Sequence, residues 1–506
     1  MDVDRLIDDS ATTLQRLRPA ALLLLRRLEQ IDVIDRLRRR DAGLWHPAPT
    51  TQAAIRARLG WLEAPSPADV RAAHTLARAC LSPGVRDVLV VATGGAGAQA
   101  RLWRWLAGPQ RAPRLHVLES LEPARVRARL ARLDPRATLV LLVLPEPPGV
   151  MVEALARIVA NWLPAAGAAR RLVALVAGDA ARGLAAMLDA APVALPADVG
   201  ERWATLSRLG LVLAALAGVD LEALTGGARA MLEACFAPDL WRNPGARLGA
   251  WLGALAQAGY DLLELMPAPR THALNSWLAV LLLGSLSKHR RGWVPITAGW
   301  PARRDQAHHL VVRAERTLAT PSHAVPLLSY RYHDTATLGA LLMLWHVGVA
   351  VAAITLGLNP FDQPDSDALE AALRQRLAGE MAPAPPSVLP LEPAALPAAR
   401  WALLAAYGVA ERQAAEVAVA LRDRYALPIC LVHPLATPAW ATQVAHAGRG
   451  DAPVLVLAQP PAADLPVPGC AWSLAELGQQ RLAIDLLAWQ RAGRPVGQLT
   501  VRDAVA

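Results

Sequence analysis

Residues 87–100 read DVLVVATGGAGAQA, a short apolar run that passes into a glycine-rich turn. The run has the length and the β-branched composition of a buried strand, and the glycines allow a tight turn into a helix. Backbone amides at such a helix N-terminus can approach an anion closely. The stretch therefore predicts a strand, a turn and a helix of an α/β fold, with Gly94 and Gly95 as candidate phosphate-binding residues.

Similar apolar runs follow on the C-terminal side of this segment. They are RLHVLES at 114–120, ATLVLLVLP at 137–145, RRLVALVAGD at 170–179 and PVALP at 192–196. Continuous apolar strands that alternate with helices are typical of a parallel sheet covered on both faces. We therefore predict a doubly wound α/β domain over 67–200, preceded by a helical N-terminal segment over 1–66, where apolar residues recur at helical spacing.

The second half of the chain has a similar pattern. Long helices are predicted at 202–218, 248–265 and 274–288, and strands at 292–297, 309–315, 324–332, 427–434 and 452–459. We predict a second α/β domain over 201–381, a proline-rich linker over 382–399, and a segment over 400–506 that completes the second domain and ends in a helix at 473–493.

Composition narrows the class of protein. The chain has 506 residues and a formal charge of +9, but Lys288 is its only lysine and the arginines are scattered, so we predict no nucleic-acid partner. The four cysteines lie far apart, and the first residues lack a basic and apolar signal, so we expect a cytoplasmic protein without a disulfide framework. The apolar stretch 340–358 is interpreted as a helix buried in a core rather than a membrane span.

Five segments resemble phosphoglucose isomerase, especially the bacterial form fused to transaldolase. They are RLGWLEAP at 58–65, PADVGERWATLSRLGL at 196–211, LWRNPGARLGAWLGALAQAGYD at 240–261, NPFDQPD at 359–365 and VPGCAWSLAELGQQRLAIDLLAWQRAGRPV at 467–496. The resemblance implies two doubly wound sugar-isomerase (SIS) domains and a dimer with its site at the interface. It also implies the interconversion of glucose 6-phosphate and fructose 6-phosphate without a metal or organic cofactor.

The resemblance also assigns roles to particular residues. Arg202 matches the family's arginine that stabilises an enediolate intermediate, and it follows Glu201 where the family has a glycine. Ser285 and Lys288 match part of the family's E-S-[TN]-G-K run, and with Gly94 and Gly95 they are the candidate substrate-binding residues. Gly284 holds the position of that run's catalytic glutamate, and glycine cannot transfer a proton.

Two further parts of the family's site differ in this chain. The family's S-K-[ST]-x-T-T phosphate cradle corresponds to LPEPPG at 144–149, which has no hydroxyl donors and carries a negative Glu146. The family's C-terminal lysine falls near 443–450, where His446 is the candidate catalytic residue. We therefore expect a family member with weak or no isomerase activity that binds a sugar phosphate, if it binds any ligand.

Two alternatives remain. The chain could be a noncatalytic scaffold or regulatory subunit that forms a homodimer, or a heterodimer with an active relative. It could also bind a dinucleotide, because residues 95–100 fit a G-x-G-x-x-A pattern and Glu119 ends the next strand, where an acid can bind a ribose.

Overall fold

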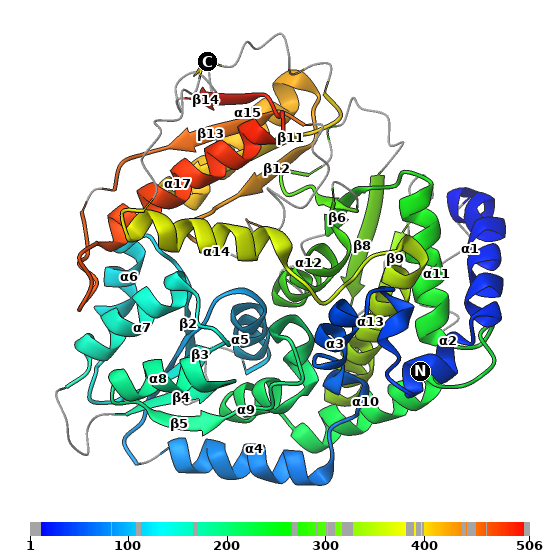
Figure 1. The fold of residues 1–506 in the computed structure, drawn as a ribbon, viewed down its shortest axis with the longest axis horizontal. Helices are drawn as coiled ribbons and strands as arrows, with labels where there is room; N and C mark the ends of the chain where they lie inside the picture. The colour runs from blue at the N-terminus through cyan, green and yellow to red at the C-terminus, as the bar shows by residue number, and fades with distance from the viewer. Residues whose placement is uncertain are drawn as a thin grey trace.

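A computed structural model of the chain gives its fold (Figure 1). The residues that it describes are 12–81, 83–107, 113–164, 171–265, 272–289, 292–299, 301, 309–315, 327–380, 389–390, 396, 399–437, 442, 452–461 and 463–499.

The first sheet contains the five strands predicted between residues 87 and 196, and all of them are confirmed. The strands run parallel in the order β2 (Arg114–Leu118), β1 (Asp87–Val91), β3 (Thr138–Leu144), β4 (Leu172–Val176) and β5 (Ala191–Ala194). The helices between and before them are α4 (Pro67–Cys80), α5 (Gly94–Ala107), α6 (Pro123–Leu130), α7 (Val150–Trp162) and α8 (Asp179–Met187).

Strand β1 shows why this sheet is apolar throughout. Val88 and Val90 belong to one buried cluster together with Trp103 of α5, whereas Leu89 and Val91 belong to a second cluster together with Leu155 of α7. Successive side chains of a strand point to opposite faces, so both faces of the sheet are covered by helices, as predicted for a doubly wound fold.

The second sheet is parallel as well, in the order β7 (Val294–Pro295), β6 (Leu262–Leu265), β8 (His309–Glu315) and β9 (Leu327–Arg331). The predicted helix over 248–265 was wrong at its C-terminal end, because α11 (Pro244–Gln257) stops before β6. Gly259 has a φ of 84°, and the amide of Tyr260 donates to the carbonyl of Leu255, which ends the helix.

The C-terminal residues form a third parallel sheet, in the order β10 (Leu389–Pro390), β14 (Val496–Leu499), β13 (Val454–Ala458), β11 (Ala402–Tyr407) and β12 (Ile429–Val432). These strands pair with one another, and the prediction that residues 400–506 complete the second domain stays a prediction. The two-residue strand β10 lies at the sheet edge within the proline-rich segment, where proline is tolerated. The remaining predicted domain boundaries are untested as well.

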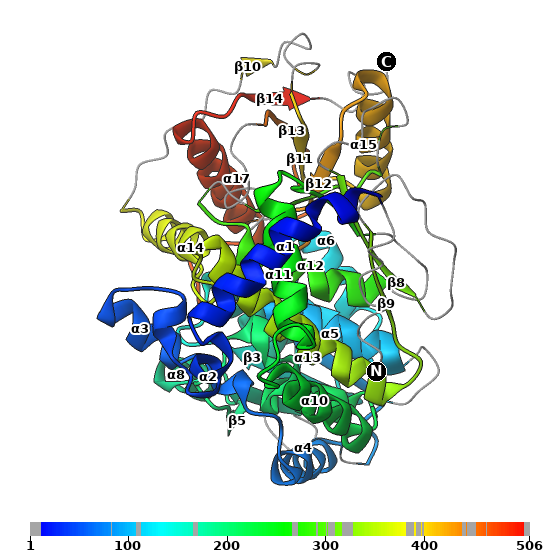
Figure 2. The same ribbon diagram turned by 90° about the vertical axis from the view of Figure 1, so that its right-hand side faces the viewer.

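The remaining helices surround these sheets, and they are listed here in chain order. They are α1 (Thr12–Gln30), α2 (Val33–Arg38), η2 (Ala42–Leu44), α3 (Pro49–Arg56), η3 (Gly60–Leu62), η4 (Glu201–Leu206), α9 (Arg208–Leu216), α10 (Leu221–Cys235), α12 (His272–Leu286), α13 (Thr335–Leu356), α14 (Pro364–Leu377), α15 (Glu411–Tyr425) and α17 (Leu474–Arg491). Helix α1 packs against α11, and Figure 2 shows it crossing the outer face of that helix.

Helix α13 is the core helix that the sequence predicted. It is long and apolar enough to span a membrane, but 89% of its most apolar window is buried inside the protein. Its ends are well defined, because Asp334 and Thr337 form a capping box and Gly357 ends the helix with a φ of 64°. The helix packs on α10, α11 and α12, so the protein itself covers its apolar surface.

Candidate active site

The glycine-rich turn lies where the sequence predicted it, between β1 and α5. Gly94 begins α5 with a φ of 62°, a backbone conformation that favours glycine. Gly95 lies against the 3₁₀-helix η4, and a Cβ atom added to Gly95 would lie 2.6 Å from the backbone nitrogen of Arg202. The close packing of these two backbones brings both candidate phosphate-binding glycines next to the candidate catalytic arginine.

Arg202 is 7% exposed and holds the loop that follows α13. Its Nη2 donates to the carbonyl oxygens of Pro360 at 3.0 Å and Asp362 at 3.1 Å, whereas its Nε and Nη1 are buried without a hydrogen-bond partner. Burial, together with the positive charge of Arg58, lowers the pKa of Arg202 to about 10.

Lys288 binds the same loop from the end of α12. Its Nζ donates to the carbonyl oxygens of Asn359 and Asp362, both at 2.7 Å, and to the Asp362 carboxylate. Burial lowers the pKa of Lys288 to about 7, and the charge of Arg202 acts in the same direction. Lys288 and Arg202 therefore share the Asp362 carbonyl, and the structure brings these two predicted site residues together.

The structure says less about the other two predicted site residues, Ser285 and His446. Ser285 lies in the last turn of α12, fully buried, and its hydroxyl has no hydrogen-bond partner. His446 lies outside the described residues, so its predicted role is untested.

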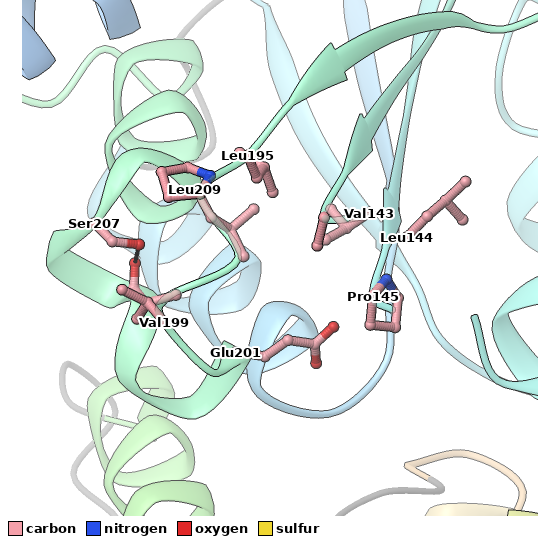
Figure 3. Close-up of a pocket in the computed structure, with 11 residues that line it drawn as sticks. Val143, Leu144, Pro145, Leu195, Val199, Glu201, Ser207 and Leu209 are labelled. Carbon is pink, nitrogen blue, oxygen red and sulfur yellow. Dashed lines mark hydrogen bonds between the residues drawn. The ribbon is translucent and has the colours of Figure 1, made fainter. Parts of the chain in front are cut away.

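Glu201 occupies the position next to the glycine turn. Figure 3 shows its carboxylate directed toward Pro145 in a cavity of about 40 Å³, which has room for a few water molecules. Burial raises the pKa of Glu201 to about 7, and a hydrogen bond from the Ala96 amide in the first turn of α5 partly offsets that rise. The hydrogen bond of Glu201 therefore goes to the N-terminus of α5.

Two more carboxylates bind helix N-termini at this edge of the first sheet. Glu146 of the LPEPPG segment accepts hydrogen bonds from the amides of Ala180 and Ala181, in the first turn of α8. Glu370 of α14 accepts one from Val150, the first residue of α7, at 2.7 Å. With Glu201, carboxylates of the chain itself thus bind backbone amides at the start of α5, α7 and α8, where anions are favoured.

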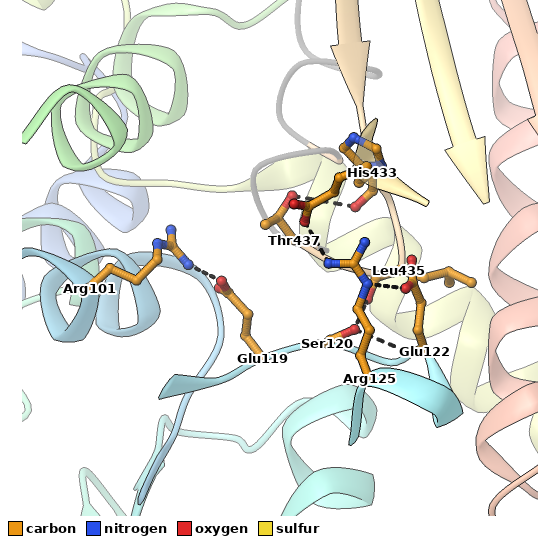
Figure 4. A network of polar contacts seen from close by, with 9 residues as sticks. Arg101, Glu119, Ser120, Glu122, Arg125, His433, Leu435 and Thr437 are labelled. Carbon is orange, nitrogen blue, oxygen red and sulfur yellow. Dashed lines mark hydrogen bonds and ion pairs between the residues drawn. The ribbon is translucent and has the colours of Figure 1, made fainter. Parts of the chain in front are cut away.

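Glu119, the candidate ribose-binding acid, lies in a network between the first and third sheets (Figure 4). It forms an ion pair with Arg101 of α5, and its Oε2 would lie 2.8 Å from a Cβ atom added to Gly97. Nearby, Arg125 of α6 pairs with both Glu122 and Glu411, which ties the first sheet to α15. The carboxylate that could bind a ribose is therefore already paired.

Several known proteins are similar to this chain in sequence. The probable glucose-6-phosphate isomerase of Haloquadratum walsbyi is 30% identical over 273 residues, which cover 50% of this chain and 63% of the relative. The glucose-6-phosphate isomerase of Carboxydothermus hydrogenoformans is 30% identical over 190 residues, or 36% of this chain and 40% of the relative. Over these partial lengths the chain is similar to glucose-6-phosphate isomerases. It matches less than two thirds of the length of each of these relatives, and no protein-family model matches it.

Solved structures share the fold of this chain. A glucose-6-phosphate isomerase from Chlamydia trachomatis superposes with a TM-score of 0.53 at 14% identity, over 71% of this chain and 87% of that one. A hypothetical protein from Thermus thermophilus superposes with a TM-score of 0.59 at 22% identity, over 72% of this chain and 99% of that one. The resemblance to the isomerase form that is fused to transaldolase remains a prediction.

Proposed function

We propose that this protein is a glucose-6-phosphate isomerase family member with little or no isomerase activity, because its own carboxylates occupy the expected sugar-phosphate site. The observation that carries the proposal is Glu201, which binds the α5 amide that a phosphate would otherwise bind. A phosphate dianion at the same amides would be repelled by this carboxylate whenever it is ionised.

The cations of the site support the same proposal. In the family mechanism an arginine stabilises the developing negative charge of an enediolate, so its guanidinium must face the substrate. Here Arg202 and Lys288 donate to backbone carbonyls of the 359–362 loop. With Gly284 at the position of the catalytic glutamate, the chain lacks a carboxylate to move the proton there.

An assay of isomerase activity tests this proposal directly. Purified protein would be given fructose 6-phosphate, with glucose 6-phosphate detected through an NADP-linked dehydrogenase, beside the Arg202→Ala variant. We expect both proteins to give the same background rate. Turnover in the unmodified chain that Arg202→Ala abolishes would overturn the proposal, since it would require a working site around that arginine.

A noncatalytic role raises the question of a partner. We propose that the chain acts in the cytoplasm as a homodimer or as a subunit of a heterodimer with an active isomerase relative. Sedimentation of the purified chain, alone and mixed with an intact isomerase from the same genome, tests both forms. A monomer in both samples would contradict this part of the proposal.

The dinucleotide alternative has less support, because Glu119 is engaged by Arg101 and packed against Gly97. A rise in the melting temperature with NAD or NADP, but none with glucose 6-phosphate, would favour it over the sugar-phosphate site.

A further inference from the structure

Four basic side chains gather around the open edge of the first sheet. Strand β2 is the edge strand, and His116 lies on it. Arg104 comes from the last turn of α5, Arg129 from the last turn of α6, and Arg132 from the turn after α6. The Arg129 Nη1 lies 3.4 Å from the His116 Nδ1, which joins α6 to the edge strand.

The contacts of His116 indicate which of its ring nitrogens carries the proton. Its Nε2 lies 2.8 Å from the buried carboxylate of Asp87. An arginine can only donate, so the Nδ1 of His116 accepts from Arg129 and the Nε2 donates to Asp87. The carboxylate of Asp87 also accepts two hydrogen bonds from Arg114, so it is already engaged by Arg114 and His116.

The three outer arginines have no such partner. Among the described residues, Arg104, Arg129 and Arg132 form no ion pair with an acid, although Arg86 and Arg114 nearby pair with Asp134 and Asp87. The charges of Arg104 and Arg132 lie close enough to Arg129 to lower its pKa, in addition to the effect of burial. Like charges held together in this way attract an anion strongly.

The cluster is separate from the candidate active site. Arg104 follows Gly94 by ten residues, so it lies about 15 Å farther along α5, toward the C-terminal end of that helix. An anion bound at the cluster would therefore lie away from Glu201 and from the cavity beside it.

We propose that Arg104, Arg129 and Arg132 form a binding site for a phosphoryl group. Guanidinium groups bind phosphate oxygens through paired N–H donors, and clusters of arginines on neighbouring elements are a recurring means of binding phosphorylated ligands. A dianion would neutralise most of the charge of the three arginines. The competing explanation is that the arginines only keep another strand from pairing with the edge of β2, and this explanation requires no bound anion.

The proposal is tested by calorimetric titration with three probes: inorganic phosphate, glucose 6-phosphate, and a phosphoserine peptide beside its unphosphorylated form. The test variant is Arg104→Gln/Arg132→Gln, both at exposed positions. The control is Arg242→Gln/Arg412→Gln, which changes the net charge equally at side chains that are 90% and 92% exposed. We expect saturable binding by the unmodified chain, at least about tenfold weaker binding by the test variant, and no change in the control.

The three probes distinguish between the classes of ligand that could carry the phosphoryl group. Binding of inorganic phosphate and glucose 6-phosphate would support a small phosphorylated metabolite, and binding of the phosphopeptide alone would support a phosphorylated protein. The proposal is overturned if none of the probes binds saturably, or if the test and control variants weaken binding equally. It is also overturned if Arg202→Ala abolishes binding while the test variant does not, since the ligand would then occupy the candidate active site.

Discussion

The carboxylate of Glu201 accepts a hydrogen bond from the backbone amide of Ala96, in the first turn of α5. This contact joins η4 to the helix that begins at the glycine turn. It also places a titratable group of the chain itself at a position where the family resemblance implies a phosphate. The consequences of this contact for stability can be measured.

We predict that Glu201 makes the folded protein less stable as the pH rises from about 4.5 to 7. Burial raises its pKa from 4.5 to about 7 in the folded state, so between these values the folded state keeps a proton that the unfolded state has lost. The free energy of unfolding should therefore fall by up to about 3 kcal/mol across this range. Glu201→Gln should remove this slope in denaturant titrations at a series of pH values.

The matched control for Glu201→Gln is Glu416→Gln, because the Glu416 side chain is 61% exposed on α15. It should leave the pH dependence unchanged. An identical slope in Glu201→Gln and the unmodified chain would show that the Glu201 carboxylate titrates as in water.

The close approach of Gly95 to Arg202 gives a second prediction. A Cβ atom at Gly95 would meet three backbone atoms of Glu201 and Arg202 within 2.8 Å, and backbone cannot move aside cheaply. Gly95→Ala should therefore destabilise the protein by about 1–3 kcal/mol, as measured by denaturant unfolding. Gly183→Ala in α8, where no atom lies within 4 Å of the added Cβ, should instead stabilise it by about 0.5–1 kcal/mol. Equal effects of the two changes would contradict the packing of α5 on η4.

Local sequence patterns predicted much of the fold, because strands such as DVLVVAT and HLVVRAE are continuous apolar runs of strand length. The strands that were missed have weaker patterns. Strand β6 follows α11 after only four residues, and β11 is rich in alanine, which favours helices. Without β11 and β14, the C-terminal residues had too few strands to indicate a sheet of their own.

The candidate site was predictable only in part, for a different reason. Arg202 and Lys288 were found because they match motifs of the family, and the glycine turn was found because it follows a short apolar strand. The roles of Glu146 and Glu370 depend on contacts with residues 34 and 220 positions away in the chain. Such contacts leave no trace in local spacing, so a single sequence cannot reveal that these acids bind helix N-termini.

His346 gives a third prediction, because it is fully buried in α13 and both of its ring nitrogens lack hydrogen-bond partners. It packs among Trp61, Trp203 and Trp277, with ring centroids 5.5 to 5.9 Å away. Replacing it by leucine removes two unpaired polar atoms at similar volume, so His346→Leu should stabilise the protein by about 1–3 kcal/mol at pH 7.5. A loss of stability at this pH would mean that the imidazole has a partner in solution.

The stabilisation by His346→Leu should also depend on pH. Burial lowers the pKa of His346 from 6.5 to about 3, so between these values the unfolded state binds a proton that the folded state does not. This histidine therefore lowers the free energy of unfolding as the pH falls from 6.5 toward 3. The gain from His346→Leu should be larger at pH 5 than at pH 7.5, and an equal gain at both would contradict the burial of a neutral imidazole.

The last prediction concerns the ion pair between Arg481 and Asp485, which lie one turn apart on α17 and next to Tyr407 of the third sheet. The side chains are 0% and 1% exposed, the Arg481 Nε donates to Asp485 at 2.7 Å, and the Tyr407 hydroxyl of β11 donates to the same carboxylate at 2.6 Å. Arg481→Met leaves the buried carboxylate without its cation, so it should cost about 3–5 kcal/mol in denaturant unfolding. Arg412→Met breaks an exposed pair with Glu416 and should cost less than about 1 kcal/mol.

A double variant separates the charge of this ion pair from its packing. Arg481→Met/Asp485→Leu removes both buried charges at once, so it should recover a large part of the stability lost in Arg481→Met. If the double variant is instead as unstable as the sum of its single changes, the arginine holds α17 in place through its hydrogen bond to Thr442 at 2.7 Å and its packing. Recovery would show that most of the cost of Arg481→Met comes from leaving a carboxylate buried and unpaired.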